Sequence, residues 1–204
     1  MYAFAQAVAA FGLLWLTTGA FAGEVAVNPS AAMRPTAKIA RIPSSEAPEI
    51  DADLSDPAWA KAGVIEDLHQ LDPDNGEPAT QRTVARVMYD KDNLYIGVRV
   101  WDTEPDKIIA NIKSRDGAIN RDDSVRLFLD PHRTRRDAYV FEVNSLGARV
   151  DSLLQNNTTV LTNWDMIWYE RSTRLPDGWI AEIALPFRYL AYDDADTSWG
   201  FELV

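Results

Sequence analysis

The sequence predicts an all-β protein, an antiparallel β-sandwich of jelly-roll-like shape with one or two short helices. Three observations lead to this fold class. Several segments alternate apolar and polar residues with period two, and they are rich in β-branched and aromatic residues. Polar turns that contain Pro or Gly separate these segments, and patterns of helical period are almost absent. Short strands with turns between them favour a sandwich.

The clearest of these segments is the stretch 121–144, which contains two alternating arms around a basic, Pro-containing break. The first arm places Val125, Leu127 and Leu129 on one face and Arg126 and Phe128 on the other. The second arm places Tyr139, Phe141 and Val143 on one face and Val140, Glu142 and Asn144 on the other. One apolar face on each strand predicts that one side of the sheet packs on a core, while the other side can meet solvent or a ligand.

The remaining strands are expected on both sides of this pair. In chain order they are residues 38–42, 64–71, 83–89, 94–101, 149–155, 164–171, 179–185 and 199–204. The last of these is too short to complete a ladder, so the domain is expected to be truncated at its carboxyl-terminal end. Short helical segments are expected after Pro57, from Glu104 to about Asn111, and at residues 186–190.

The segments 83–89 and 94–101 are expected to form a hairpin, because the polar run Asp90-Lys91-Asp92-Asn93 separates them. If Tyr89 faces Leu94 across this turn, Arg86 pairs with Gly97. The outer face of the hairpin then carries the side chains Met88, Arg86, Tyr95, Arg99 and Trp101.

The amino terminus is expected to be a signal peptide. Residues 1–22 carry no charged side chain and end in Ala20-Phe21-Ala22, the small-x-small pattern that signal peptidase recognises, so cleavage is expected before Gly23. No Lys or Arg precedes the apolar run, and the same segment could also just span a bilayer and remain as an anchor. Residues 23–37, rich in Ala, Pro and Ser, are expected to be a linker to the domain at 38–204.

Composition excludes several classes of site. The chain of 204 residues has a formal net charge of −11, which argues against nucleic acid as a partner because phosphates require a basic surface. No cysteine is present, so disulfides, thiolate metal sites and cysteine nucleophiles are excluded. With only His69 and His132, a site of several histidines is nearly excluded too. The acidic loop 72–77 does not have the spacing of an EF-hand and is expected to be a solvated turn, with calcium as the lesser alternative.

Five motifs in the same order resemble those of the family 9 carbohydrate-binding module. They are Asp53-Leu54…Trp59, Leu94-Tyr95-Ile96-Gly97, Asp123-Ser124-Val125-x-Leu-Phe-Leu-Asp130, Phe141-x-Val-Asn144 and Gly178-Trp179-x-Ala-Glu182-Ile-x-x-Pro186. The resemblance implies an all-β sandwich that binds sugar between two tryptophans, binds calcium, is not catalytic and is often joined to glycoside hydrolases. The chain most resembles modules that precede an outer-membrane β-barrel in Gram-negative bacteria, which implies export to the periplasm or outer membrane, with membrane contact only through a barrel beyond this chain.

The resemblance also implies the positions of a carbohydrate site. Its first stacking tryptophan falls on Asn120, its acid on Arg126 and its arginine on Glu142, while its asparagine is kept as Asn144. The second tryptophan would lie beyond Val204. Stacking on aromatic faces supplies much of the affinity of sugar sites, so Trp101, with Arg99 two residues before it, is a candidate for one missing ring. The alternative for Trp101 is packing in the core, which is the commoner role of a tryptophan at the end of a strand.

The two charges in this site are reversed together, so attraction between them is kept, and Arg126 and Glu142 are expected to form a salt bridge. Two independent solvated charges are the alternative. Arg86, Arg99 and Arg126 are expected to bring cationic groups onto one face, with Asn144 beside them, which favours an acidic glycan over a neutral one.

The sequence also bears on functions other than sugar binding. Asp122 and Asp123 point to opposite faces of a strand and cannot act together in glycoside hydrolysis, so no catalytic set is expected. The domain could instead be a periplasmic structural or interaction domain of a barrel protein without sugar binding. A remote alternative is a haem-binding sandwich with Met88 as an axial ligand and His69 near a loop, although Met88 beside Tyr95 is more simply packing.

Overall fold

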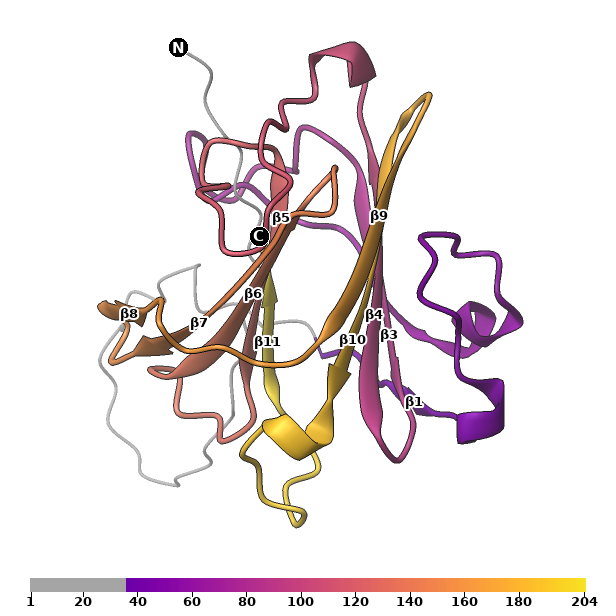
Figure 1. Ribbon diagram of the computed structural model, residues 1–204, viewed down its shortest axis with the longest axis vertical. Helices are drawn as coiled ribbons and strands as arrows, with labels where there is room; N and C mark the ends of the chain where they lie inside the picture. The colour runs from indigo at the N-terminus through magenta and orange to yellow at the C-terminus, as the bar shows by residue number, and fades with distance from the viewer. Residues whose placement is uncertain (1–35) are drawn as a thin grey trace, which may run out of the picture.

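The computed structural model describes residues 36–204, which form two facing β-sheets (Figure 1). Sheet 1 contains β1 (Ala40–Arg41), β2 (Gly63–Ile65), β3 (Thr83–Tyr89), β4 (Asn93–Trp101), β9 (Tyr169–Leu175) and β10 (Gly178–Pro186). Sheet 2 contains β5 (Ser124–Asp130), β6 (Ala138–Asn144), β7 (Arg149–Gln155), β8 (Thr159–Leu161) and β11 (Gly200–Leu203). The predicted all-β sandwich is confirmed, and every strand pair in the two sheets is antiparallel except β1 with β3.

The strand order explains which segments become neighbours. Sheet 1 runs β1-β3-β4-β10-β9, with β2 also paired to β3, and sheet 2 runs β11-β5-β6-β7-β8. The hairpins β3–β4, β5–β6 and β9–β10 join consecutive strands, whereas β10 pairs with β4 although the strands β5 to β9 lie between them in the chain. The connection between β4 and β5 therefore carries the chain from one sheet to the other.

Helical segments are limited to short 3₁₀ turns in the part of the chain that the structure describes. They are η2 (Ser44–Glu46), η3 (Pro57–Lys61), η4 (Pro105–Lys107) and η5 (Phe187–Tyr189). Pro57 opens η3 as expected, but the helix predicted from Glu104 to about Asn111 stops at Lys107. None of the described helices is long and apolar enough to cross a membrane.

Most of the predicted strands are present in the structure, but two of them are wrong in part. The segment 64–71 forms a strand only at β2, followed by an isolated bridge between His69 and Pro78. The segment 164–171 joins the sheet only from Tyr169, and β8 before it was not predicted. The reason is that the N–H of Met166 donates to the buried carboxylate of Asp151 at 2.6 Å, so this alternating segment packs on the core without a ladder partner.

The main core lies between the two sheets. From sheet 2 it receives the predicted inner faces of β5 and β6, and from sheet 1 it receives the alternate residues of β4 and β10. Its most deeply buried members include Ile96, Val98, Leu127, Phe141, Val143, Trp168, Ile183 and Leu185. Because each strand has one apolar face, both sheets keep an outer face that the core does not use.

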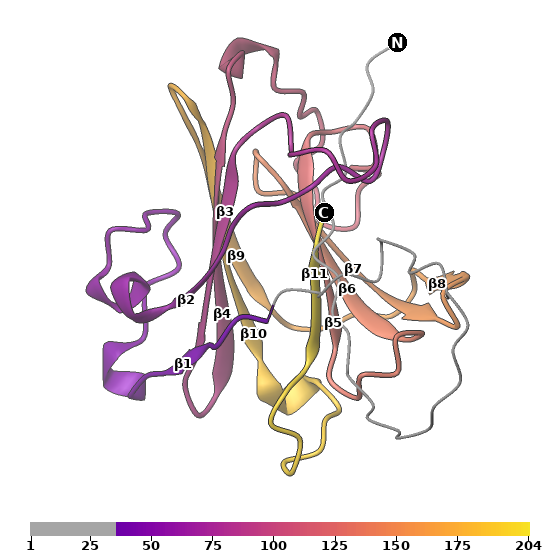
Figure 2. The same ribbon diagram turned by 180° about the vertical axis from the view of Figure 1, so that it is seen from behind.

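Residues 42–62 cover the outer face of sheet 1 (Figures 1 and 2). This covering segment brings Trp59 onto the sheet, where Met88 and Tyr95 join it in a second apolar cluster. A Cβ at Gly97 would lie 2.5 Å from Leu54 Cδ2 and 3.1 Å from the Trp59 ring, so only glycine leaves room for this contact. Met88 is completely buried there, where its thioether packs against apolar neighbours, as the simpler interpretation predicted.

The carboxylate of Glu182 anchors the covering segment. Glu182 stands opposite Gly97 in the β4–β10 register and is completely buried. Its Oε2 accepts the backbone N–H groups of Asp51 at 2.9 Å and Ala52 at 2.7 Å, and its Oε1 accepts the indole N–H of Trp59 at 2.8 Å. Burial raises the pKa of Glu182, and these three hydrogen bonds offset that effect only in part.

Candidate functional site

Arg126 and Glu142 stand directly opposite each other on the outer face of sheet 2, in the β5–β6 register. Arg126 Nη2 lies 2.8 Å from Glu142 Oε2, and Nε donates to the same oxygen at 2.9 Å, so the predicted salt bridge is confirmed. The hydroxyl of Ser124 donates to Glu142 Oε1 at 2.7 Å. Both carboxylate oxygens of Glu142 are therefore held in place by neighbours on β5.

The pair is partly shielded from water. The side chain of Arg126 is 32% exposed and that of Glu142 is 9% exposed. A charge pair in such a position gains more from attraction than a fully solvated pair, because the effective dielectric constant is lower. The exposed part of the guanidinium can still donate to a ligand on this face.

Phe128 is a residue of this face that the sequence reasoning placed correctly but did not propose as part of a site. It follows Arg126 by two positions on β5 and is half-buried, opposite Val140. Its ring is absent from the core between the sheets. Phe128 could have been proposed from the sequence, because it is two residues from Arg126 and its side chain therefore points to the same face of the strand. We refer to Ser124, Arg126, Phe128, Val140 and Glu142 as the sheet 2 face.

Asn144 does not belong to this face, which corrects the role expected from the resemblance. Its side chain is completely buried. Its amide donates to Ile112 O and to Asp122 Oδ2, both at 2.8 Å, and its Oδ1 accepts from Leu146 N at 3.0 Å and Ala148 N at 2.9 Å. These four bonds tie the β4–β5 connection to the β6–β7 turn and leave no group for a sugar.

Asp122 completes this internal anchor. Its carboxylate accepts the backbone N–H groups of Asn111 at 3.0 Å and Ile112 at 3.1 Å besides the amide of Asn144. Burial acts to raise the pKa of Asp122, but the hydrogen bonds outweigh it and hold the pKa below the ordinary value. Asp123 accepts only the N–H of Ile109, at 2.7 Å, and burial raises its pKa. The two acids thus hold the loop and form no catalytic pair.

Asn120, at the predicted position of the first stacking tryptophan, is exposed on the loop that Asp122 holds. Its side chain makes no hydrogen bond within residues 36–204. An amide at this position offers donors and an acceptor but no flat apolar surface. The stacking surface implied by the resemblance is therefore missing here, and Phe128 is the aromatic side chain on this face.

Arg99 and Trp101 lie on sheet 1, so they cannot share a face with Arg126. The expectation that Arg86, Arg99 and Arg126 gather cationic groups on one face is wrong for this reason. Arg86 instead donates to Trp59 O at 3.2 Å beneath the covering segment. The alternation of side chains along a strand determines which face each one is on, but it does not determine which strands become neighbours in a sheet.

The calcium implied by the resemblance can be compared with the acidic side chains that the structure describes. Within residues 36–204, no three acidic or histidine side chains come together in a group that could hold a metal ion. Calcium prefers six to eight oxygen ligands, which usually include several carboxylates. The calcium expected from the resemblance thus has no carboxylate cluster in this part of the chain to support it, and it stays a prediction.

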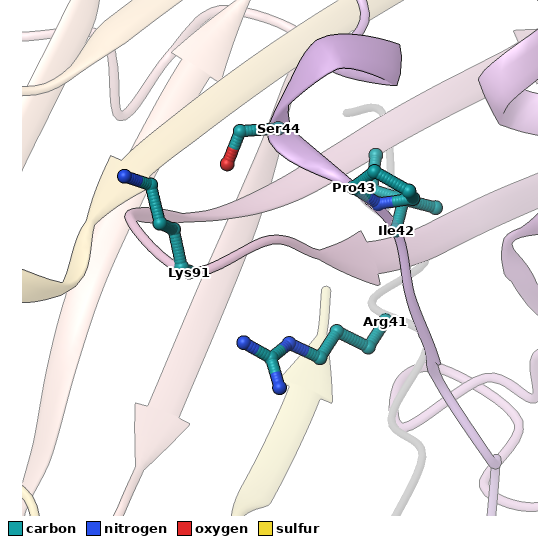
Figure 3. Close-up of a pocket in the computed structure, with 5 residues that line it drawn as sticks. All are labelled: Arg41, Ile42, Pro43, Ser44 and Lys91. Carbon is teal, nitrogen blue, oxygen red and sulfur yellow. The ribbon is translucent and has the colours of Figure 1, made fainter.

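A shallow hollow of about 350 Å³ lies at the β3–β4 turn, lined by Arg41, Ile42, Pro43, Ser44 and Lys91 (Figure 3). The guanidinium of Arg41 and the ammonium of Lys91 point in different directions and do not converge on one point (Figure 3). Trp101 is at the opposite end of β4. This hollow is therefore a weaker candidate than the sheet 2 face.

Comparisons with known proteins bear on the family and on the fold. A family model described as carbohydrate family 9 binding domain-like matches residues 50–204. A family 9 carbohydrate-binding module from Caldicellulosiruptor kristjanssonii, in complex with glucose, is 20% identical with a TM-score of 0.54, over 80% of this chain and 76% of that chain. The cellotriose complex of such a module from the same organism gives the same identity and TM-score, over 81% and 75%.

A solved structure from Bacteroides uniformis is 13% identical with a TM-score of 0.58, over 82% of this chain and 89% of that chain. At these identities the solved structures show a shared fold. A comparison with curated proteins finds no matching sequence.

Proposed function

The chain belongs to the carbohydrate family 9 binding domain-like family, and from this premise we propose that it is a carbohydrate-binding module whose ligand lies on the sheet 2 face. The family consists of binding domains, so the proposed activity is recognition and not catalysis. The observation that carries the proposal is the oriented pair of Arg126 and Glu142 on an outer sheet face, with an aromatic ring two residues away.

The chemistry of this face suits a hydroxyl-rich ring. Arg126 supplies N–H donors in a fixed fork, and Glu142 and Ser124 supply acceptor lone pairs, so neighbouring hydroxyls can donate and accept at once. Phe128 offers an apolar surface for the C–H face of a sugar. Such a combination of a few fixed polar groups with an aromatic surface is typical of small-molecule sites.

The ligand is proposed to be neutral. An acidic glycan was expected on the basis of three arginines, but two of them lie on sheet 1, and Glu142 balances the charge of the third. Glucose and cellotriose are bound in the similar structures, and they supply the first ligands to try. An oligogalacturonate of the same length tests the acidic alternative.

Replacing Arg126 by alanine is expected to weaken cello-oligosaccharide binding by about 10-fold or more, because a hydrogen bond to a charged group contributes about 1.5–3 kcal/mol. Isothermal titration calorimetry, with and without calcium, measures the effect. Arg41→Ala is the control, because it removes a more exposed arginine whose side chain makes no hydrogen bond or ion pair within the described residues. Equal losses in both variants, or tighter binding of the oligogalacturonate, would contradict the proposal.

The same variants measure the salt bridge. A double-mutant cycle of Arg126→Ala and Glu142→Ala, followed by urea unfolding, is expected to give an interaction free energy of about 1 kcal/mol, the upper end of exposed pairs. If the protein folds normally and binds no glycan in a broad screen, the alternative of a structural or interaction domain without sugar binding is favoured.

We further propose that the protein is exported to the periplasm or outer membrane and is joined to a glycoside hydrolase or an outer-membrane β-barrel. The support is the apolar segment 1–22 with its Ala20-Phe21-Ala22 end, which lies outside the described residues, together with the resemblance. Mature protein from an envelope fraction is expected to begin at Gly23. Amino-terminal sequencing that reads from Met1 would instead support retention of the segment as an anchor.

A further inference from the structure

A cleft of about 530 Å³ opens at the end of sheet 1 where β4 finishes. Its walls come from the loop segments 66–68 and 78–82, from residues 101–103 at the end of β4, and from Asp177 in the β9–β10 turn. The β9–β10 turn and the end of β4 lie together in Figure 1, and Asp102 N donates to Asp177 O at 3.0 Å. No residue of the sheet 2 face lines this cleft, so it is a separate place on the molecule.

The walls of the cleft are joined by hydrogen bonds. The side-chain amide of Gln81 donates to Thr103 Oγ1 at 3.0 Å, and Thr103 N donates to Gln81 Oε1 at 3.1 Å. Gln70 Nε2 donates to Pro78 O at 2.8 Å, and Ala79 N donates to Leu68 O at 2.9 Å, which fixes the loop on the other side. A cleft held in this way needs little rearrangement to accept a ligand.

Trp101 supplies an aromatic wall, and two arginines stand against its ring. The guanidinium carbon of Arg99 is 4.7 Å from the ring centroid and that of Arg82 is 4.2 Å from it. Arg99 is fixed, since its side chain is only 12% exposed and bonds to Asp177 and to the carbonyls of Val100 and Trp179. Arg82 is 63% exposed, and its nearest carboxylate, Glu66, is 3.9 Å away.

Arg82 is therefore the side chain that a ligand can displace. A cation–π contact at an exposed site is weak, and a loose ion pair adds little to it. When Arg82 moves aside, the ring of Trp101 is open to an apolar ring face of comparable size.

The polar lining of the cleft consists mainly of hydrogen-bond acceptors. Four carboxylates line it, from Glu66, Asp67, Asp102 and Asp177, against the single guanidinium of Arg82. Threonine hydroxyls at 80, 83 and 103 add groups that both donate and accept. Such a lining favours a neutral ligand with many O–H donors and disfavours an anionic one.

We propose that this cleft is a second carbohydrate site, which takes a neutral oligosaccharide ring onto Trp101 after displacement of Arg82. The inference rests on the proposed function in that the ligand is a glycan, but it uses a different sheet and different residues. A chain with two sites on two sheets can bind one long glycan or two neighbouring chains with greater avidity than either site alone.

The test is calorimetric titration of the purified protein with cellotriose, in four forms: unchanged, Phe128→Ala, Trp101→Ala and the double variant. The expected stoichiometry is two per chain for the unchanged protein, one for each single variant and none for the double variant. Arg82→Ala, an exposed substitution that leaves the fold intact, is expected to tighten binding about 3-fold in the Phe128→Ala background. Galacturonate trimer is expected not to bind in that background.

The outcomes separate the two proposals. If Trp101→Ala changes neither stoichiometry nor affinity while Phe128→Ala abolishes binding, the second site is overturned and the sheet 2 face stands. If Trp101→Ala abolishes all binding and Phe128→Ala has no effect, the cleft stands and the sheet 2 face is overturned. Weaker cellotriose binding after Arg82→Ala in the Phe128→Ala background contradicts the displacement of Arg82 by the ligand. Galacturonate trimer binding equal to that of cellotriose in the same background contradicts the preference of the cleft for a neutral glycan.

Discussion

Asp122→Asn is expected to lower the free energy of unfolding by about 3 kcal/mol at neutral pH, which corresponds to about 6–12 °C in Tm for a domain of this size. The carboxylate accepts N–H groups from Asn111, Ile112 and Asn144 inside the protein. An asparagine there can accept on one side only, and its own NH₂ group would face donors on the other. Buried donors without an acceptor are what make this substitution costly.

The cost is expected to depend on pH in a defined direction. The folded pKa of Asp122 lies below the ordinary value of 3.8, so its stabilisation is present above pH 3.8 and is lost as the pH falls through the folded pKa. The difference between the unchanged protein and Asp122→Asn should therefore shrink in strongly acidic solution. Urea unfolding at a series of pH values measures it.

Asp123→Asn is the matched control, because Asp123 is the adjacent acid and accepts from Ile109 N alone. Its loss is expected to stay below about 1 kcal/mol. Its folded pKa is raised, so its contribution is fully present below pH 3.8 and falls as the pH rises through the folded pKa, opposite to Asp122. Equal losses with the same pH trend in both variants would show that Asp122 is not the anchor of the loop.

Glu182→Ala is expected to cost about 3–5 kcal/mol, the largest effect of any single substitution considered. It leaves the backbone N–H groups of Asp51 and Ala52 and the indole N–H of Trp59 without their acceptor, at a position the covering segment closes to water. Glu182→Gln keeps one acceptor and is expected to lose about half as much. Chemical unfolding gives both values, and hydrogen exchange at residues 51 and 52 reports local release of the segment.

The control for Glu182 is Glu170→Gln on β9. Glu170 is also buried, but the nearest donor to its carboxylate is the hydroxyl of Ser172, at 3.4 Å. A loss below about 1 kcal/mol is expected there.

Because burial raises the pKa of Glu182, its stabilisation is fully present below pH 4.5 and declines as the pH rises through the folded pKa. The cost of Glu182→Gln should accordingly be larger at pH 4 than at pH 8, and the reverse trend would contradict this account.

The motifs that carry the family resemblance have a structural explanation in this fold. Leu54 and Trp59, Gly97 and Glu182 come from three different motifs and meet at one point on the outer face of sheet 1. Asn144 comes from a fourth motif and meets Asp122, which directly precedes the fifth. These residues hold the covering segment and the β4–β5 connection, which is why they identify the family without identifying the ligand.

The sequence by itself determined most of the strands and the direction of their side chains, although β8 was not predicted and the segments 64–71 and 164–171 form strands only in part. Side chains alternate along any strand, so the inner faces of β5 and β6 and the β3–β4 register could be read from parity and from one turn. The pairing of Arg126 with Glu142 was predicted differently, from the two charges that are reversed together relative to the resembled family, and the β5–β6 register places the two residues opposite each other.

Only the tertiary structure decided which faces of the two sheets are open to solvent and which residues lie together on the same face. Tyr95 and Gly97 point outward as predicted, but residues 42–62 cover them, and the β4–β5 connection covers Asn144. Arg99 and Arg126 each stand between two apolar residues on an alternating strand, yet the two strands belong to different sheets. These outcomes depend on packing between segments that are far apart in the chain, and local alternation of apolar and polar residues does not specify such contacts.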